Sequence, residues 1–318
     1  MSDTWAEFIW DGEENAVVYG FFGWISESVA VKKLLASVGL VIMLVPTSGV
    51  LAQCTDSGVA LQILGSGGPF GDGRASSGYI IWVDGVSRVM VDAGGGTFSR
   101  FHQTGAAIED LQLMAMSHFH PDHSAELPAL LWPRNGTLRI SGPSGTEGFP
   151  ALPEYLDGLF GSDGVFRVLN SRFEFAPQTV DVERSEATTV YEDSLMTVTA
   201  LGVPHGDVPT LGYRIEYAGS SFVLSSDQNG SDPRFVEFAR DADILVVHFA
   251  GSEFGTGFAA ELHARPSVWG RIATDANVGR LVLSHIMANG DLETNLEFLQ
   301  ENYQGLLTVG EDLLCVLP

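Results

Sequence analysis

The feature that most constrains the fold of this chain is the run Ser117-His-Phe-His-Pro-Asp-His123, which directly follows the apolar segment Leu111–Met116. The run places three imidazoles and one carboxylate within a few positions, and these groups are common ligands of Zn²⁺. In α/β proteins, functional sites gather at the carboxyl ends of strands. The run therefore predicts an α/β protein with a metal site at the end of a buried strand.

The spacing inside the run predicts two neighbouring ions. His118 and His120 alternate along the backbone, and Pro121 disfavours helix at His120, so both imidazoles can point the same way. Asp122 and His123 then turn in a different direction. One pair can hold one ion and the other pair its neighbour, so we expect two Zn²⁺ per chain, with Fe or Mn as alternatives.

The run alone cannot complete two sites, so further ligands must come from elsewhere in the chain. Three metal-competent residues follow other strand-like segments: His205, Asp227 and His285. Each alone fits an ordinary surface or core residue equally well. Together with the first cluster, they predict that several strand ends meet at one metal centre.

Strand-like and helix-like segments alternate along the chain, which indicates a layered α/β fold in one domain. The predicted helices are Pro233–Arg240 and Arg265–Ala276. The predicted strands are Leu61–Leu64, Tyr79–Val83, Val89–Val91, Leu111–Met114, Phe222–Leu224, Ile244–Val247 and Leu281–Leu283. The segment Gly148–Asn170 is either a lid over the metals or a packed surface insertion.

In this order the segments resemble the metallo-β-lactamase-fold hydrolases, in particular the branch of ribonuclease Z and its arylsulfatase-like relatives. The resemblance covers about residues 59 to 290 and includes the His-x-His-x-Asp-His motif. The other matching segments are Val59–Gly68, Val89–Gly96, Leu211–Glu216, Ser225–Asp227, Ala242–Val247, His263 and Leu283–His285. The resemblance implies a four-layer αββα sandwich, which periodicity alone does not indicate.

The resemblance also implies a role for each matching residue. The implied metal ligands form two sets that share one bridging carboxylate: His118, His120 and His205 for one zinc, Asp122, His123 and His285 for the other, and Asp227 between them. His263 matches a histidine that stabilises or protonates the transition state, and we count it with Asp122 as catalytic.

Three further residues are weighed against ordinary structural roles. Asp92 either orients the metal loop or is a simple turn residue before the glycines that follow it. His248 stands where the ribonuclease Z branch usually has a glutamate that pairs with the catalytic histidine. It is either a replacement partner for His263 or a histidine at the edge of the core. His102 has no motif around it and is expected to be structural.

Two divalent ions about 4 Å apart can clamp the attacking and leaving oxygens and turn a shared water into a nucleophile near neutral pH. We therefore expect a zinc-dependent hydrolase of a small phosphodiester, sulfate or carboxyl ester. β-Lactamase activity is an alternative ranked lower, because true β-lactamases lack a bridge of the Asp227 type. A zinc-binding module without turnover is the non-enzymatic alternative.

Charge argues against a nucleic-acid substrate. The chain has 16 basic and 40 acidic residues, a net charge of −24. Proteins that bind nucleic acid gain most of their affinity from cations that neutralise phosphates. The segment Leu127–Thr179, where a ribonuclease Z carries a basic arm, has few cations. We expect a small-molecule ester and a homo-oligomer, and keep 3′ tRNA processing of the ribonuclease Z type as an alternative.

The N-terminal region predicts export. Val31–Lys33 is a short basic segment, Leu34–Val45 is apolar, and Val50–Ala52 is a small-residue cleavage pattern. These features are typical of a signal peptide over 31–52, cleaved after Ala52, that directs the domain 53–318 to the periplasm or the exterior. A short membrane anchor is the alternative, although so short an apolar run spans a bilayer poorly, so we expect no stable span after cleavage. Residues 1–30 are either a mis-set start or a real extension.

The two cysteines fit an oxidising compartment. Cys54 and Cys315 lie near the two ends of the predicted mature domain, and neither belongs to a cluster with metal-ligand spacing. We predict one disulfide between them, with two separate thiols as the alternative.

Overall fold

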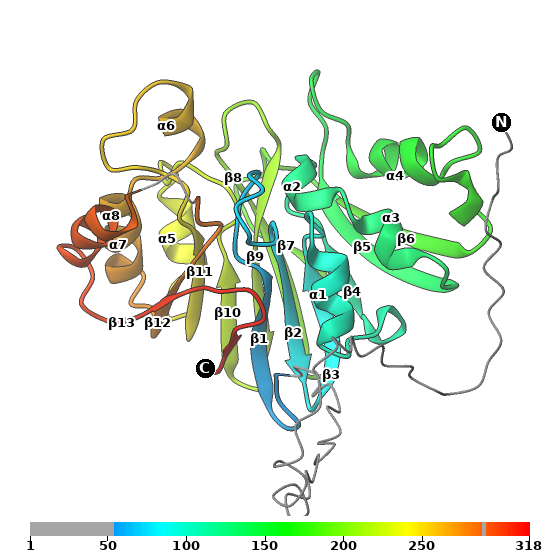
Figure 1. Ribbon diagram of the computed structural model, residues 1–318, viewed down its shortest axis with the longest axis horizontal. Helices are drawn as coiled ribbons and strands as arrows, with labels where there is room; N and C mark the ends of the chain where they lie inside the picture. Colours follow the sequence, from blue (N-terminus) through cyan, green and yellow to red (C-terminus); the bar gives the residue numbers. More distant parts are fainter. Residues whose placement is uncertain (1–53, 288–290) are drawn as a thin grey trace, which may run out of the picture. The chain divides into compact units, whose positions relative to one another are not determined.

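Two mixed β-sheets of seven strands each face one another (Figure 1). The computed structural model describes residues 54–287 and 291–318, so the predicted extension and signal peptide lie outside the described residues. The first sheet has the order β14 (Cys315–Val316), β1 (Val59–Gly65), β2 (Gly78–Val83), β3 (Val86–Val91), β4 (Leu113–Ala115), β5 (Gly136–Pro143) and β6 (Phe173–Val180). The second has the order β13 (Leu306–Val309), β12 (Arg280–Ser284), β11 (Ile244–His248), β10 (Ser220–Leu224), β9 (Thr210–Tyr217), β8 (Met196–Val203) and β7 (Thr188–Glu192).

Helices cover the outer face of each sheet. The first sheet is covered by α1 (Thr97–Gln103), α3 (Leu127–Leu131) and α4 (Leu152–Phe160). The second is covered by α5 (Arg234–Phe238), α7 (Pro266–Asp275) and α8 (Leu292–Gln300). The remaining helical segments are α2 (Pro121–Ser124), α6 (Phe258–Leu262), η1 (Ile108–Asp110) and η2 (Arg167–Leu169). The predicted αββα sandwich is confirmed.

The alternation of side chains along the strands sorts them into separate cores. Leu61 and Ile81 point from the first sheet into the space between the sheets, where they pack with Phe222 of the second. Their neighbours Ala60 and Ile80 point the other way, into the core beneath the helices of the first sheet. Because both faces of these strands are buried, their sequences are nearly continuous apolar runs.

Strand direction decides where the functional side chains lie. Strands β3 to β6 run parallel in the first sheet, and β10 to β13 run parallel in the second. The residues that follow β3, β4, β10, β11 and β12 therefore emerge at carboxyl ends, where sites of α/β proteins form. In Figure 1 these ends point to the top, where α2 and α6 lie.

Most predicted elements are confirmed, with two differences. Strand β4 begins at Leu113 rather than at Leu111, because the chain leaves the 3₁₀ turn η1 only at Asp110, with two residues between the turn and the strand. The segment Gly148–Asn170 forms α4 and η2, and its apolar side chains Leu152, Leu156 and Phe160 are buried against the first sheet. Most of this segment is therefore the packed insertion, and only its first residues face the metal centre.

None of the helices within 54–287 and 291–318 combines the length and the apolar character needed to cross a bilayer.

Replacement of the predicted disulfide should destabilise the fold. The structure joins Cys54 to Cys315, which are 261 positions apart in the sequence and have Cα atoms 5.3 Å apart. A cross-link over so long a loop restricts the unfolded chain, typically by about 2–4 kcal/mol. Cys54→Ser should lower the free energy of unfolding by about this amount in urea titration without reductant. The double variant Cys54→Ser/Cys315→Ser should lose no more than either single variant, and equal stability of variant and wild type would contradict the effect.

Candidate metal centre

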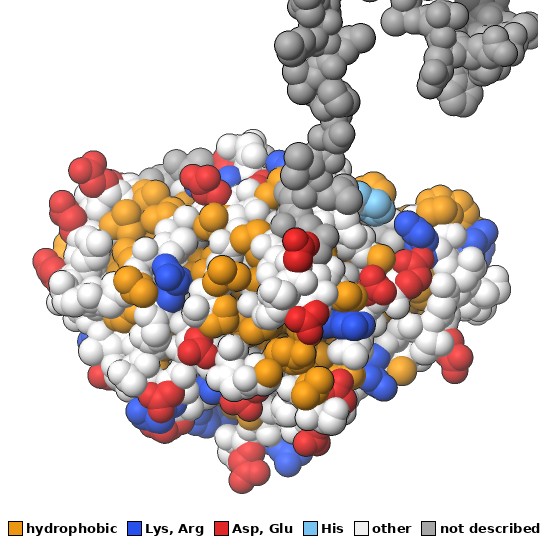
Figure 2. Space-filling view, turned by 90° about the horizontal axis from the view of Figure 1, so that it is seen from below, with side chains coloured by type: hydrophobic (Ala, Val, Ile, Leu, Met, Phe, Trp, Pro, Cys, Tyr) orange, Lys and Arg blue, Asp and Glu red, His pale blue; other side chains and the backbone are white. Residues whose placement is uncertain are grey.

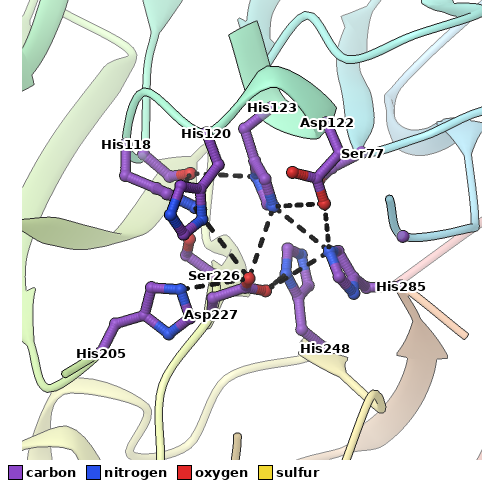
Figure 3. A network of polar contacts seen from close by, with 12 residues as sticks. Ser77, His118, His120, Asp122, His123, His205, Ser226, Asp227, His248 and His285 are labelled. Carbon is purple, nitrogen blue, oxygen red and sulfur yellow. Dashed lines mark hydrogen bonds and ion pairs between the residues drawn. The ribbon is translucent and has the colours of Figure 1, made fainter. Parts of the chain in front are cut away.

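The seven predicted metal ligands meet in one cluster, and six of them follow the carboxyl ends of parallel strands (Figure 3). His118 and His120 follow β4, and the short helix α2 carries Asp122 and His123. The remaining three come from the second sheet: His205 from the loop after β8, Asp227 from the loop after β10, and His285 from the residue after β12. Residues up to 167 positions apart in the sequence thus form one cluster.

One group consists of His118, His120, His205 and Asp227, whose possible ligand atoms all lie within 4.8 Å of one another. His118 Nε2 is 3.1 Å from His120 Nδ1 and 4.0 Å from Asp227 Oδ2. His205 Nε2 is 3.5 Å from the same Asp227 oxygen. The four side chains could therefore hold one ion.

A second group lies on the other side of Asp227. His123 Nε2 and His285 Nε2 are 3.2 Å apart, and each is 3.6 Å from an oxygen of Asp227. Asp122 Oδ2 lies 3.2 Å from His285 Nε2 and 3.7 Å from His123 Nε2. These residues could hold a second ion, with Asp227 shared between the two groups.

The chemistry of this donor set fits divalent cations. Burial lowers the pKa of His118 and His205, which leaves neutral imidazoles with a free lone pair. His205 Nε2 is buried without a hydrogen-bond partner, and a metal ion would satisfy it. Burial would raise the pKa of Asp227, but the charges of His285 and His123 hold it well below its usual value, so the carboxylate is ionised.

Asp92 fixes the orientation of His123. Its carboxylate accepts hydrogen bonds from Ser117 N at 2.7 Å and Ser117 Oγ at 2.8 Å, and lies 2.7 Å from His123 Nδ1. Nε2 of His123 is thereby turned toward the cluster, the arrangement in which carboxylates orient metal-binding histidines. This geometry supports the orienting role over the simple turn residue.

Metal binding should weaken as pH falls, because Nε2 of His123 carries a proton in the metal-free site. Burial would lower the pKa of His123, but the charges of Asp227 and Asp92 raise it well above its usual value. That proton must leave before Nε2 can bind a metal. For one released proton, the apparent Kd for Zn²⁺ should rise by about tenfold for each unit that the pH falls below the pKa of His123. Competition with a chromophoric chelator measures this slope, and an affinity independent of pH would contradict it.

Three residues around the cluster adopt backbone conformations that side chains rarely take. Asp92, Ser226 and His285 have φ values of 60°, 53° and 52°. Such strain is concentrated at functional sites, where the surrounding structure enforces it. Gly94 is required for another reason, since a Cβ there would lie 2.0 Å from the Asp122 carbonyl oxygen. Sequence reasoning identified Asp92 and His285 as site residues, but it identified neither Ser226 nor the unusual backbone conformations.

His248 lies beneath Asp227. Its Nδ1 is 2.7 Å from Asp227 Oδ1, and its Nε2 is 3.0 Å from the hydroxyl of Tyr79 on the opposite sheet. An ionised carboxylate only accepts hydrogen bonds, so Nδ1 donates. Burial lowers the pKa of His248 to about 4, so the ring is neutral at pH 7 and Nε2 accepts. With both nitrogens engaged, none is left to pair with His263, as the replacement-partner alternative requires. Proximity also groups His248 with His123, Asp227 and His285 as a metal-competent set, but these hydrogen bonds favour a positioning role.

Removal of the His248 imidazole should weaken metal binding. Loss of a partner that orients a ligand typically costs about 10- to 100-fold in metal affinity. We expect His248→Ala to raise the Kd for Zn²⁺ by this factor in chelator competition, and His248→Gln, which keeps a donor, to have a smaller effect. Tyr79→Phe tests the support from the opposite sheet, and unchanged affinity in His248→Ala would contradict the positioning role.

His263 lies directly after α6 and faces both groups. Its ring centroid is 5.3 Å from that of His205 and 5.9 Å from that of His285. Burial lowers the pKa of His263 to about 4, so the ring is neutral at pH 7. Its Nδ1 is buried without a hydrogen-bond partner. The residue is placed to donate a hydrogen bond to a molecule bound beside the metals.

Two hollows adjoin the cluster. The larger has a volume of about 790 Å³, and its lining includes His205, Phe149 and Asp207. The smaller has a volume of about 260 Å³, and its lining includes His263, Phe249 and Ile286. A molecule bound at the cluster could therefore extend into either hollow.

Comparison with known proteins connects this arrangement to a family. Residues 87–286 match the family model described as "Beta-lactamase superfamily domain". The chain is 27% identical over 272 residues to the ribonuclease Z of Mycobacterium bovis (strain BCG / Pasteur 1173P2), covering 80% of this chain and 96% of that protein.

Two solved structures share the fold. The metallo-β-lactamase fold protein YhfI from Bacillus subtilis superposes with a TM-score of 0.62 at 20% identity, covering 81% of this chain and 98% of that one. The short form of human tRNase Z superposes with a TM-score of 0.61 at 18% identity, with the same coverage of both chains.

Proposed function

Since this chain belongs to the β-lactamase superfamily and is a metal-dependent hydrolase of ester bonds, we propose that it is a zinc-dependent phosphodiesterase of the ribonuclease Z kind. The observation that carries the proposal is the position of Asp227 between two buried groups of imidazoles and carboxylates. A shared carboxylate suits a pair of ions close enough to act on one phosphate. Two Zn²⁺ per chain are proposed because imidazole and carboxylate ligands suit zinc.

When bound, a metal pair would supply Lewis-acid activation of water and of the phosphoryl oxygens. The side chains of the protein provide the rest. Asp227 stays ionised and faces both groups, while Asp92 and His248 hold His123 and Asp227 in place. His263 would donate its N–H to the phosphoryl or leaving oxygen, where negative charge develops during P–O cleavage.

The relatives change the ranking of substrates. From charge we expected a small ester, with 3′ tRNA processing as an alternative. However, the relative from Mycobacterium bovis described above is named ribonuclease Z. That alternative is now better supported than sulfate or carboxyl ester hydrolysis, to which the relatives described above give no support. The phosphodiester is therefore the proposed bond.

One observation favours a small diester over RNA as a second candidate. The larger hollow beside His205 is lined by four carboxylates and one arginine. The carboxylates of this hollow do not suit the phosphate backbone of a nucleic acid. The face seen in Figure 2, at the end opposite the metal centre, has basic side chains scattered among acidic ones where grey atoms do not cover it.

Export to the periplasm or the exterior remains a proposal. It is supported by the pairing of Cys54 with Cys315, because disulfides persist in oxidising compartments. The homo-oligomer remains a prediction.

Hydrolysis assays with two phosphodiesters test the proposed function. The zinc-loaded protein is given bis(p-nitrophenyl) phosphate and, separately, a precursor tRNA with a 3′ trailer, each with a chelator-treated control. Chelator-sensitive hydrolysis of either one supports a phosphodiesterase, and the tRNA result decides whether RNA is a substrate. His102→Ala changes an exposed side chain on α1 and should leave turnover unchanged. Failure to hydrolyse either diester with two metal equivalents bound would overturn the proposal.

A further inference from the structure

We propose that the larger hollow, the cleft beside His205, binds a cationic group, so that the substrate is a small phosphodiester with an alkylammonium substituent. This inference rests on the proposed phosphodiesterase and names the class of its substrate.

The cleft begins at the metal centre. His205 lines it, and the Nε2 atom of this buried residue has no hydrogen-bond partner and lies 3.5 Å from Asp227 Oδ2. Phe149 also lines the cleft, and its ring centroid is 5.9 Å from that of His120. A phosphate held at the metals would therefore direct one of its two ester substituents into the cleft.

The cleft has an excess of unpaired negative charge. Arg234 is the only cation among the lining residues. It donates to Asp232 through Nε at 2.8 Å and through Nη2 at 2.5 Å. Nη1 of Arg234 donates to the Arg184 carbonyl oxygen at 2.8 Å. The other lining carboxylates are exposed and form no ion pair within the described part of the chain: Glu147, Glu183 and Asp207. The charge of Glu183 also acts on Arg234.

These charges exclude one class of substituent and favour another. A polynucleotide in the cleft would bring further phosphates beside three unpaired carboxylates, whereas nucleic-acid sites supply cations. An ammonium group would instead be attracted by all three. Phe149 adds an aromatic face near the metals, and aromatic rings bind quaternary ammonium groups by cation–π attraction. A small phosphodiester with an alkylammonium ester group can interact with both the carboxylates and the aromatic ring.

A matched pair of substrates isolates the charge of this substituent. p-Nitrophenyl phosphocholine and p-nitrophenyl 3,3-dimethylbutyl phosphate have the same leaving group and nearly the same shape, and differ in whether nitrogen or carbon carries the three methyl groups. With the zinc-loaded full chain, we expect kcat/KM for the choline ester to exceed that for the neutral ester by at least about tenfold, which corresponds to about 1.4 kcal/mol.

Charge-neutralising variants locate the effect. The double variant Glu147→Gln/Asp207→Asn should reduce the ratio of the two kcat/KM values toward one. Glu301→Gln is the control, because it removes the same kind of charge from an exposed residue at the end of α8, outside the cleft lining. A ratio that falls equally in both variants would overturn the assignment of the effect to the cleft.

The outcomes separate this inference from the proposed function. Equal hydrolysis of both esters by the wild type, or hydrolysis of precursor tRNA alone, would overturn the cationic subsite and leave the phosphodiesterase intact. Failure to hydrolyse any of these diesters with both metals bound would overturn both proposals. A preference for the choline ester that weakens with added salt and disappears in the double variant would support the cationic subsite.

Discussion

Asp227→Ala should abolish hydrolysis and release at least one of the two proposed metal ions. Among the residues that the structure describes, Asp227 is the one side chain shared by both groups of possible ligands, and it is buried and ionised. Its loss leaves the facing imidazoles without the anion that offsets two divalent charges. Because metal ions contribute several kcal/mol of transition-state stabilisation, we expect kcat to fall by at least about a thousandfold.

Metal content and turnover must be measured on the same sample of this variant. Mass spectrometry should find fewer than two equivalents of metal in Asp227→Ala, while His102→Ala keeps both the metal and the activity. Asp227→Asn keeps the shape of the side chain without its charge and should resemble the alanine variant. An active Asp227→Ala protein with full metal content would falsify the bridging assignment.

His263→Ala should separate catalysis from metal binding. The residue faces both groups, but its ring is neutral and its Nδ1 is unpartnered. Loss of a positioned acid or hydrogen-bond donor typically lowers kcat by about 10²- to 10⁴-fold. We expect a loss in this range with two metal equivalents still bound. A comparable loss of metal would instead assign His263 to the ligands.

The pH dependence of this effect tells how His263 acts. Because burial lowers the pKa of His263 to about 4, the ring does not change its charge between pH 6 and 8. The ratio of wild-type to His263→Ala activity should then be constant over that interval. If the ring acts as a cationic acid, the ratio will fall as pH rises through its pKa. A constant ratio would assign the residue to hydrogen-bond stabilisation of the transition state.

The sequence allowed the ligands to be predicted because each follows a recognisable strand. The run from His118 to His123 identifies the metal loop, and His205, Asp227 and His285 each come shortly after an apolar run. Parallel strands bring such residues to the same edge of a sheet. The resemblance to a known family then supplied the second sheet and the four layers, which local patterns do not contain.

Other features could not be predicted, because they depend on contacts across the two sheets. The hydrogen bond between Tyr79 and His248 joins residues 169 positions apart. It forms only because the packing of the two sheets places β2 opposite β11. The strands β5 and β6 were also missed. Several of their side chains are exposed, so their sequences lack the continuous apolar runs that identified the central strands.

The distribution of the ligands over both sheets has a consequence for the order of folding. Neither sheet alone contains a complete set of ligands, since His118 and His120 belong to one half of the sandwich and His205 and Asp227 to the other. A partly folded chain therefore has no high-affinity site, and capture of the ions must follow the docking of the two halves. Bound metal then stabilises the interface between the halves, because any opening of this interface must first release the metal. Zinc-loaded protein should consequently resist slow, global unfolding far more than local fraying at its surface loops.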